Sequence, residues 1–165
     1  MVTWHPEEEV EMAALQLINT FFGVPQLSIL LSEIPDDHLD MVRFYTQYWN
    51  SHWQIFLEGY FVPEKPLANY PIKRACLGNH EIIGVYDSYV VPVNIPSETV
   101  HILNAQSASQ VVLQAIANYG TYHGIVYNCI GAKVSEISVA LNTDPVAIPV
   151  PPCGIVQLEK KQSKI

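Results

Sequence analysis

From Tyr60 onward, turn residues divide the sequence into short apolar runs, and this pattern constrains the fold more than any other feature. The runs are rich in β-branched residues and recur about every ten residues, which is typical of the strands of an antiparallel β-sandwich. The predicted strands are Pro71–Ala75, Glu81–Tyr86, Tyr89–Val93, Thr99–Asn104, Gln110–Ile116, Gly124–Cys129, Glu136–Leu141 and Gly154–Glu159. Val146–Pro152 is predicted to be a rigid, extended segment that leads to the last strand.

Before Gly59 the apolar residues recur at helical spacing instead. Pro6 and the acidic run Glu7–Glu9 indicate the start of a helix, because a helix N-terminus favours proline and negative charge. This helix is predicted to end at Gly23, and its apolar stripe is formed by Val10, Ala14, Leu17, Ile18 and Phe21. A second helix is predicted from Pro35-Asp36-Asp37 to Glu58, with Gly59 as its end.

The segment Val24–Leu31, between the two helices, is apolar at nearly every position. Such a run is typical of a strand that is buried on both faces of a parallel sheet. A strand of this kind needs parallel neighbours, and no other segment of the chain has the same pattern. The first 59 residues therefore look like a fragment of an α/β architecture.

Charge and cysteine content limit the partners and the compartment. The formal net charge is −8, and the only basic cluster is Lys160, Lys161 and Lys164, so we expect neither nucleic acid nor an anionic membrane as a partner. Three widely spaced cysteines form no disulfide framework, which favours the cytoplasm. The N-terminus does not resemble a signal peptide, and no apolar stretch has the roughly 18 residues needed to span a bilayer.

The sequence contains no signature of phosphate-loop, dinucleotide, serine-hydrolase or zinc-protease chemistry. Its six histidines include no pair at ligand spacing on one predicted element, so no metal and no cofactor are expected. Cys129 lies in a predicted strand and is interpreted as a buried packing residue. The aromatic residues Tyr45, Tyr48, Trp49 and Trp53 recur at helical spacing, which favours a core stripe over a sugar platform.

Several segments resemble bacterial α-galactosidases of the melibiase type, which are glycoside hydrolase family 36-like. Residues 4–19, which begin Trp-His-Pro-Glu-Glu-Glu, resemble the late barrel segment of these enzymes, and Phe22–Ile29 resembles their final barrel strand. The final barrel helix of these enzymes resembles five stretches of this chain: Ile34–Leu39, Arg43–Tyr45, Tyr48-Trp49, His52 and Leu57–Gly59. The entry to their C-terminal β-domain resembles Asn69–Pro71, and the exit from such domains resembles Val150–Val156.

The resemblance implies an α+β chain in which residues 1–59 are a helix–strand–helix remnant of a (β/α)8 barrel and residues 60–165 are an antiparallel β-sandwich. It implies a C-terminal fragment of an α-galactosidase-like enzyme of carbohydrate metabolism. Retaining glycosidases use two carboxylates, which these enzymes carry on earlier barrel strands, so the chain is expected to be catalytically incomplete alone. Trp4 and His5 precede a helix where a strand-to-helix loop would line a barrel site, and they are the predicted contacts to a galactoside-type sugar.

Two other functions remain open. The chain could be a non-catalytic carbohydrate-binding β-sandwich module, although all three tryptophans precede the predicted sandwich. It could also be a subunit that completes a barrel from another chain. We further expect a homo-oligomer formed through residues 10–58, because an unpaired barrel strand and the apolar helix faces would otherwise be exposed. The alternative is a monomer in which the helices fold back over the strand and against the sandwich.

Overall fold

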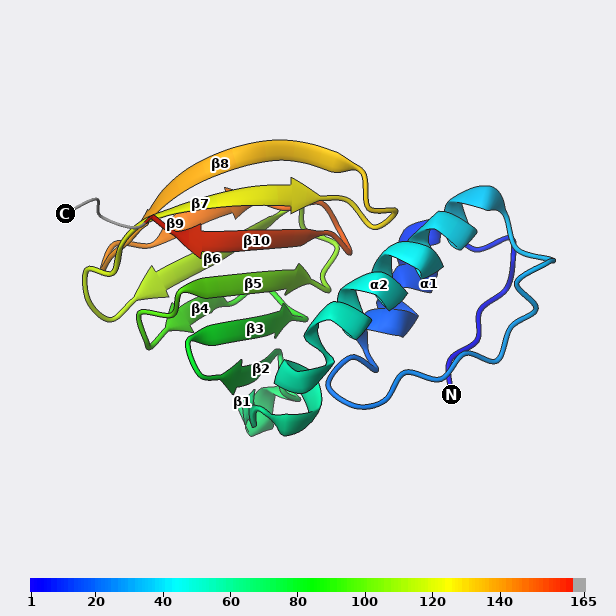
Figure 1. Cartoon of the computed structure of the whole chain (residues 1–165), viewed down its shortest axis with the longest axis horizontal. Helices are drawn as coiled ribbons and strands as arrows, with labels where there is room; N and C mark the ends of the chain where they lie inside the picture. Colours follow the sequence, from blue (N-terminus) through cyan, green and yellow to red (C-terminus); the bar gives the residue numbers. More distant parts are fainter. Residues whose placement is uncertain (162–165) are drawn as a thin grey trace.

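The computed structural model describes residues 1–161 as two α-helices followed by a body of ten strands in two sheets, so the chain is α+β (Figure 1). The helices are α1 (Val10–Ile18) and α2 (Asp36–Glu58), and η1 (Pro66–Ala68) is a 3₁₀ turn. The strands are β1 (Tyr60–Glu64), β2 (Ile72–Leu77), β3 (His80–Val85), β4 (Val90–Val93), β5 (Thr99–Asn104), β6 (Gln110–Ala115), β7 (Gly120–Tyr127), β8 (Lys133–Leu141), β9 (Val146–Pro149) and β10 (Ile155–Lys160). Residues 162–165, which include Lys164 and the end of the predicted sandwich region, lie outside the described residues.

Helix α2 has the predicted bounds. Asp36 and Asp37 lie in its first turn, where the helix dipole favours negative charge. Gly59 is the C-cap and has extended backbone angles. A Cβ at this position would lie 2.3 Å from the carbonyl oxygen of Ile55 and 2.8 Å from that of Cys76. Glycine is therefore required at position 59 because the end of the helix passes very close to β2.

Helix α1 starts later than predicted. Residues 6–8 form an exposed turn, and the first helical residue is Val10. The backbone N–H of Glu8 donates to the carbonyl of His5 at 3.0 Å, and the N–H of Glu7 lies 3.3 Å from Nδ1 of the same residue. These bonds satisfy the turn locally, so the acidic run precedes the helix.

The prediction of a buried strand over Val24–Leu31 is wrong. The segment forms one isolated parallel bridge, between Leu27 and Val2, while Val24 and Leu30 are each 63% exposed. Within residues 1–161, no strand pairs with Leu27 on the side opposite Val2. Most of the segment Val24–Leu31 is therefore not covered by neighbouring strands. The expectation that no other segment pairs with it in parallel is also wrong, because Val2 does.

The strands form a seven-stranded sheet of order β1-β2-β3-β5-β10-β7-β8 and a three-stranded sheet of order β4-β6-β9. The prediction of a purely antiparallel sandwich is wrong in two places, since β3 pairs with β5 and β4 with β6 in parallel. From β3 to β6 the chain alternates between the two sheets. A strand that returns to the same sheet after such a crossing can run in the same direction as its predecessor.

Two strands were not predicted, β1 and β9, and both lie at a sheet edge. Each contains a proline, Pro63 in β1 and Pro149 in β9, and the edge strand β4 contains Pro92. Proline cannot donate to a strand ladder, so within sheets it is found mainly at edges, where it also discourages pairing with other chains. Proline is the reason why these strands were not predicted from the sequence, and it also explains why they lie at sheet edges.

One face of the seven-stranded sheet packs on the three-stranded sheet, and part of the other face packs on the helices, while outward residues of β7, β8 and β10 such as His123, Glu136 and Glu159 are exposed. Ile83 faces the three-stranded sheet in an aliphatic core, whereas the preceding residue, Ile82, faces the helices. Leu103 and Ile155 also contact the helical layer, which lies across one end of the strands (Figure 1). Phe21 and Phe56 are buried in this contact, while Trp53 stays 41% exposed. Much of the apolar surface expected to form an oligomer interface is thus used inside the chain.

Candidate functional site

Trp4, one of the two predicted sugar contacts, lies in the core formed by the N-terminal segment and the helices. Its side chain is 6% exposed, and its indole Nε1–H donates to Nδ1 of His38 at 2.9 Å. The other ring nitrogen of His38, Nε2, lies 3.0 Å from the carbonyl oxygen of Glu8. Because a carbonyl only accepts, the neutral imidazole carries its proton on Nε2. The three residues therefore tie the turn before α1 to the first turn of α2.

His5, the second predicted contact, is exposed to solvent. Its backbone N–H lies 3.3 Å from Oε1 of Glu8. The structure thus places the side chain of Trp4 in the core and that of His5 on the surface. Nothing in this arrangement tests whether either residue contacts a sugar, so their role stays a prediction.

The partner of Trp4, His38, was missed by sequence reasoning. The two residues are 34 positions apart, and the sequence offers no periodicity or motif that connects them. His38 is buried within the first turn of α2, where the two preceding aspartates drew attention as a helix start instead. Only the packing of α2 beside the N-terminal segment makes the pair.

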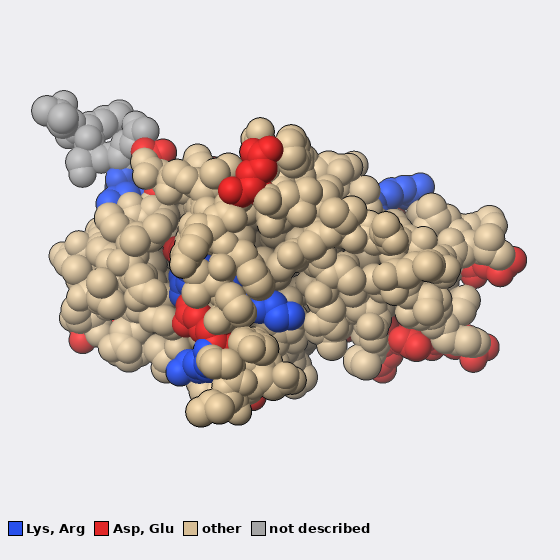
Figure 2. All heavy atoms as spheres, turned by 90° about the horizontal axis from the view of Figure 1, so that it is seen from below, with Lys and Arg blue, Asp and Glu red and all other residues tan. Residues whose placement is uncertain are grey.

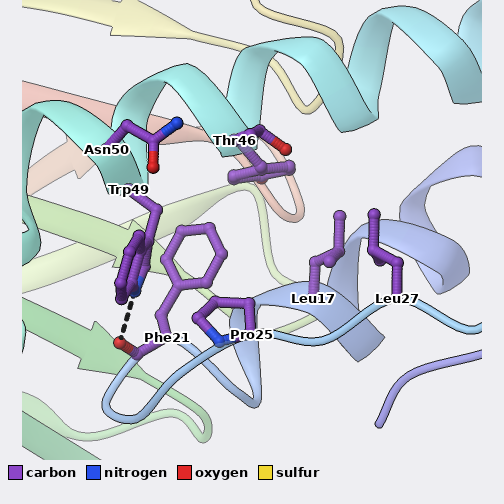
Figure 3. A pocket seen from close by; sticks show the side chains of 8 residues that line it. Leu17, Phe21, Pro25, Leu27, Thr46, Trp49 and Asn50 are labelled. Carbon is purple, nitrogen blue, oxygen red and sulfur yellow. Dashed lines mark hydrogen bonds between the residues drawn. The ribbon is translucent and has the colours of Figure 1, made fainter.

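A pocket of about 270 Å³ opens between the two helices and the segment that follows α1 (Figure 3). Trp49 forms one wall, and its Nε1–H donates to the carbonyl oxygen of Phe21 at 3.1 Å. The polar side chains at its margin are Thr46 and Asn50, both exposed residues of α2. The remaining lining residues are Leu17, Phe21, Pro25, Leu27 and Tyr45. The pocket is small and mainly apolar, so it suits one ring-sized group.

Carboxylates gather at the helical end of the molecule, where Figure 2 shows acidic side chains on the surface. The exposed acids there are Glu7, Glu8, Glu9, Glu33, Asp36, Asp37 and Asp40. Within residues 1–161, no group of three or more His, Cys, Asp or Glu side chains is close enough to hold a metal ion. The acids belong to turns and helix starts, as expected for residues that interact with the first turn of a helix.

An ion-pair network lies at one end of the sandwich interior. The guanidinium of Arg74 contacts both Glu81 and Glu64 and also donates to the carbonyl of Pro92 at 2.6 Å. Burial alone would lower the pKa of Arg74, but the two carboxylates raise it above its ordinary value. The network joins β1, β2, β3 and β4, which indicates a role in holding the two sheets in register.

The cysteines are not activated nucleophiles. Cys129 follows the end of β7 and is buried, and burial raises its pKa to about 11. Cys153 is also buried, its pKa is raised to about 12 by the same cause, and its thiol lies 3.1 Å from the carbonyl of Glu11. A thiol with such a pKa stays protonated at neutral pH, so the packing role predicted for Cys129 fits its surroundings.

No family model, no curated protein and no solved structure matches the chain. Among residues 1–161, neither helix is long and apolar enough to cross a membrane.

Proposed function

We propose that this chain is the C-terminal part of an α-galactosidase-like glycoside hydrolase and that it is catalytically incomplete alone. The observation that carries the proposal is the order and pairing of the elements at the N-terminus. A short extended segment at Val2 is followed by α1, then by a second extended segment at Leu27 that pairs with the first in parallel, and then by α2. Two parallel segments joined by a helix are the unit from which (β/α)8 barrels are built.

The free edge at Leu27 supports the same proposal. The backbone of Val2 uses both of its polar groups, with Gln26 and Ser28 as partners at 2.7 and 2.8 Å. Within residues 1–161, the N–H and C=O of Leu27 itself have no backbone partner. Exposed apolar side chains surround this edge, among them Val24, Leu30 and Leu31. In a complete barrel the first strand would pair with this edge and cover these side chains.

The proposed sugar contacts follow from this placement. Trp4 and His5 stand at the carboxyl end of the first extended segment, which is the end where barrel enzymes bind substrate. We propose that Trp4 fixes the loop through His38 and that the exposed His5 faces a galactoside-type sugar. The odd number and wide spacing of the three cysteines support a reducing cytoplasm as the compartment.

An activity assay tests the proposal in two steps. The chain alone is incubated with aryl α-galactosides and other aryl glycosides, and we expect no turnover above a mock purification. It is then produced with a barrel polypeptide that ends before this segment, and turnover is expected only in the complex. Leu27→Pro, which removes the free N–H at the edge, should abolish that gain, whereas Leu67→Pro in the exposed η1 turn should not. Turnover by the chain alone, lost on changing one of its acids, would overturn the proposal.

A second candidate, a carbohydrate-binding module, is favoured by two exposed tyrosines near the edge of the sandwich. Tyr60 in β1 is 77% exposed, and Tyr70 after η1 is 41% exposed. Aromatic faces open to solvent are suitable platforms for sugar rings. Saturation-transfer NMR with galactose and galactosides would detect contact with these rings. A signal that disappears in Tyr60→Ser and persists in Tyr119→Phe would favour this candidate over the hydrolase fragment.

A further inference from the structure

The net negative charge of the chain comes entirely from residues 1–59. This part of the sequence contains nine acidic residues and one basic residue, Arg43, whereas residues 60–165 contain seven of each. Arg43 is itself paired with Asp40 at 3.1 Å, and both side chains are exposed. Figure 2 shows acidic side chains on the surface at the helical end of the molecule. A partner that binds this end is therefore favoured by positive charge.

The backbone at Leu27 is an open strand edge in this acidic part of the chain. In the parallel bridge, the N–H of Val2 donates to the carbonyl of Gln26 at 2.7 Å, and the N–H of Ser28 donates to the carbonyl of Val2 at 2.8 Å. In a parallel pair these bonds leave the N–H and C=O of Leu27 on the side opposite Val2. Within residues 1–161 the two groups have no backbone partner. An edge of this kind can pair with an added strand.

The apolar pocket between the helices lies next to this edge. Leu27 lines one side of the pocket, and Thr46 and Asn50 of α2 lie on another side (Figure 3). Residues directly opposite each other on neighbouring strands project to the same face. The residue of an added strand that lies opposite Leu27 therefore projects to the face on which Leu27 lines the pocket.

The size of the pocket suits an aromatic side chain. An apolar cavity of about 150 Å³ can hold a benzene ring. The pocket has a volume of about 270 Å³ and is open to solvent, so it has room for the ring of a phenylalanine. Its walls include the aromatic residues Phe21, Tyr45 and Trp49, which can pack against such a ring.

Exposed side chains continue the apolar and acidic character along the same segment. Val24 and Leu30 are each 63% exposed, Leu31 is 48% exposed, and the exposed Glu33 follows them. A strand that pairs at Leu27 would cover part of this apolar surface. A second copy of the chain would bring the same excess of negative charge to the edge, so a basic segment suits it better.

We propose that the edge at Leu27 binds an extended, basic segment of another polypeptide, which places an aromatic side chain opposite Leu27 and into the pocket. The inference rests on the proposed function for the use of this edge, and it adds the chemistry of the segment that pairs there. Main-chain hydrogen bonds to Leu27 provide affinity, and the pocket selects the aromatic residue. Lys or Arg side chains of the segment interact with the acidic surface.

Peptide binding to the full chain tests this inference without a measurement of hydrolysis. The ligand is a fluorescently labelled peptide of alternating lysine and valine with one central phenylalanine, and fluorescence anisotropy measures its binding. We expect binding that weakens as salt is added, because exposed charges are screened. A peptide with alanine in place of phenylalanine, and one with N-methyl groups on its central amides, should each bind at least about tenfold more weakly. A peptide with glutamate in place of lysine should not bind.

A substitution in the chain tests the pocket separately from the edge. Thr46→Phe places a ring in the pocket from the side of α2, and Thr46 is exposed, so the variant should keep the parent circular dichroism spectrum. It should bind the phenylalanine peptide about tenfold more weakly than the parent does. Gln47→Phe is the matched control, because Gln47 is the next exposed residue of α2 and does not line the pocket.

The inference is overturned if the phenylalanine, alanine and N-methylated peptides bind equally, or if Thr46→Phe binds the phenylalanine peptide as tightly as Gln47→Phe does. It is also overturned if the glutamate peptide binds as tightly as the lysine peptide. Self-association of the chain that the lysine peptide does not reverse would show that a second copy occupies the edge, and this too would overturn it. Failure of the proposed function looks different, because the peptide then binds while no barrel polypeptide gives turnover with the chain.

Discussion

The two faces of the seven-stranded sheet are stabilised in different ways. The face toward the three-stranded sheet packs through Val, Ile and Leu, with Tyr122 as its one fully buried aromatic residue among those described. The face toward the helices packs against Trp4, Phe21, Tyr45, Tyr48 and Phe56, and it also includes Cys129 and Cys153. The face toward the three-stranded sheet therefore makes contacts between aliphatic side chains. The face toward the helices makes contacts between large aromatic rings, some of which carry polar atoms that need hydrogen-bond partners.

This difference shows where specificity resides in the molecule. Apart from the Arg74 network, the aliphatic interface depends on the alternation of side chains along each strand, because branched side chains of similar size interdigitate readily. The aromatic interface needs particular hydrogen bonds, such as that of the Tyr48 hydroxyl with His101 and that of the Tyr45 hydroxyl with the carbonyl of Cys153. We therefore expect the sandwich to tolerate loss of the helices, and the helical layer to depend on individual contacts.

The largest effect should come from removing residues 1–59. The fragment 60–165 is expected to fold, since the aliphatic core lies entirely within it. It should nevertheless lose roughly 5 kcal/mol or more, because Ile82, Leu103 and Ile155 become exposed and each buried side chain of this kind contributes about 1.5–3 kcal/mol. Urea unfolding followed by far-UV circular dichroism measures this. A fragment without a cooperative transition would show that the helices supply essential core.

Alanine substitutions at Ile82 and Ile83 compare the two faces within one strand. Both residues are almost completely buried, at 1% and 0% exposure. In the full chain each substitution should lower the free energy of unfolding by about 2–5 kcal/mol. In the fragment 60–165, Ile83→Ala should remain as costly, while Ile82→Ala should change stability by less than about 1 kcal/mol. Equal losses at both positions in the fragment would contradict the division into two separate cores.

Trp4→Phe tests the hydrogen bond that ties the N-terminal segment to α2. The substitution removes the indole N–H and leaves Nδ1 of the buried His38 without its donor. We expect a loss of about 1–3 kcal/mol in the free energy of unfolding. Trp53→Phe is the control, because Trp53 is partly exposed and a surface change usually alters stability by less than about 0.5 kcal/mol. Equal losses in the free energy of unfolding for the two substitutions would contradict a structural role for the Trp4 hydrogen bond.

The buried thiols predict a loss of stability at alkaline pH. The pKa of Cys153 is raised to about 12 in the folded chain, whereas an ordinary thiol ionises near 9. Above pH 9 the unfolded chain releases this proton and the folded chain keeps it. Stability is therefore present in full below pH 9 and falls by about 1.4 kcal/mol per pH unit above it, until the folded pKa is reached. Cys153→Ala should flatten the decrease between pH 9 and 10 by about 1 kcal/mol, and an unchanged slope would contradict this assignment.

The smallest effect concerns self-association, which was predicted for residues 10–58. We propose that any such contact uses the exposed apolar part of this region near the free edge at Leu27, since Phe21 and Phe56 are buried within the chain. Light scattering at micromolar concentrations should give a mass that rises with concentration. Leu30→Glu should reduce that rise, and Val134→Glu, at an exposed position of β8, should not. A monomer mass at every concentration would exclude the interface.

Strand positions after Gly59 were largely predictable, whereas the way the strands pair was not. Every strand predicted from Pro71 onward is present, because alternation and turn residues are local signals. The parallel pairing of β3 with β5 depends on β4 crossing to the other sheet, and a spacing of about ten residues fits a hairpin equally well. The edge strands β1 and β9 were missed because their prolines are also signals for irregular structure.

The candidate sites show the same limit. Trp4 and His5 were adjacent in the sequence and were predicted to act together, yet one is buried and the other exposed. The six histidines include no pair at ligand spacing on one predicted element, yet His52 of α2 and His101 of β5 have ring centres 5.0 Å apart in the fold. This contact joins residues far apart in the sequence, so no local pattern could predict it.

The sequence by itself determined the bounds of α2, the series of strands and the change from helices to strands at Gly59. Each of these features depends on residues that are close together in the chain. Tertiary structure alone decided that Val24–Leu31 is not a strand. A strand that is buried on both faces requires hydrogen-bonded neighbours and covering layers, and residues 1–161 provide only one bridge, to Val2. The local sequence pattern determines which secondary structure a segment can adopt. The neighbouring segments in the folded chain decide whether the segment adopts that structure.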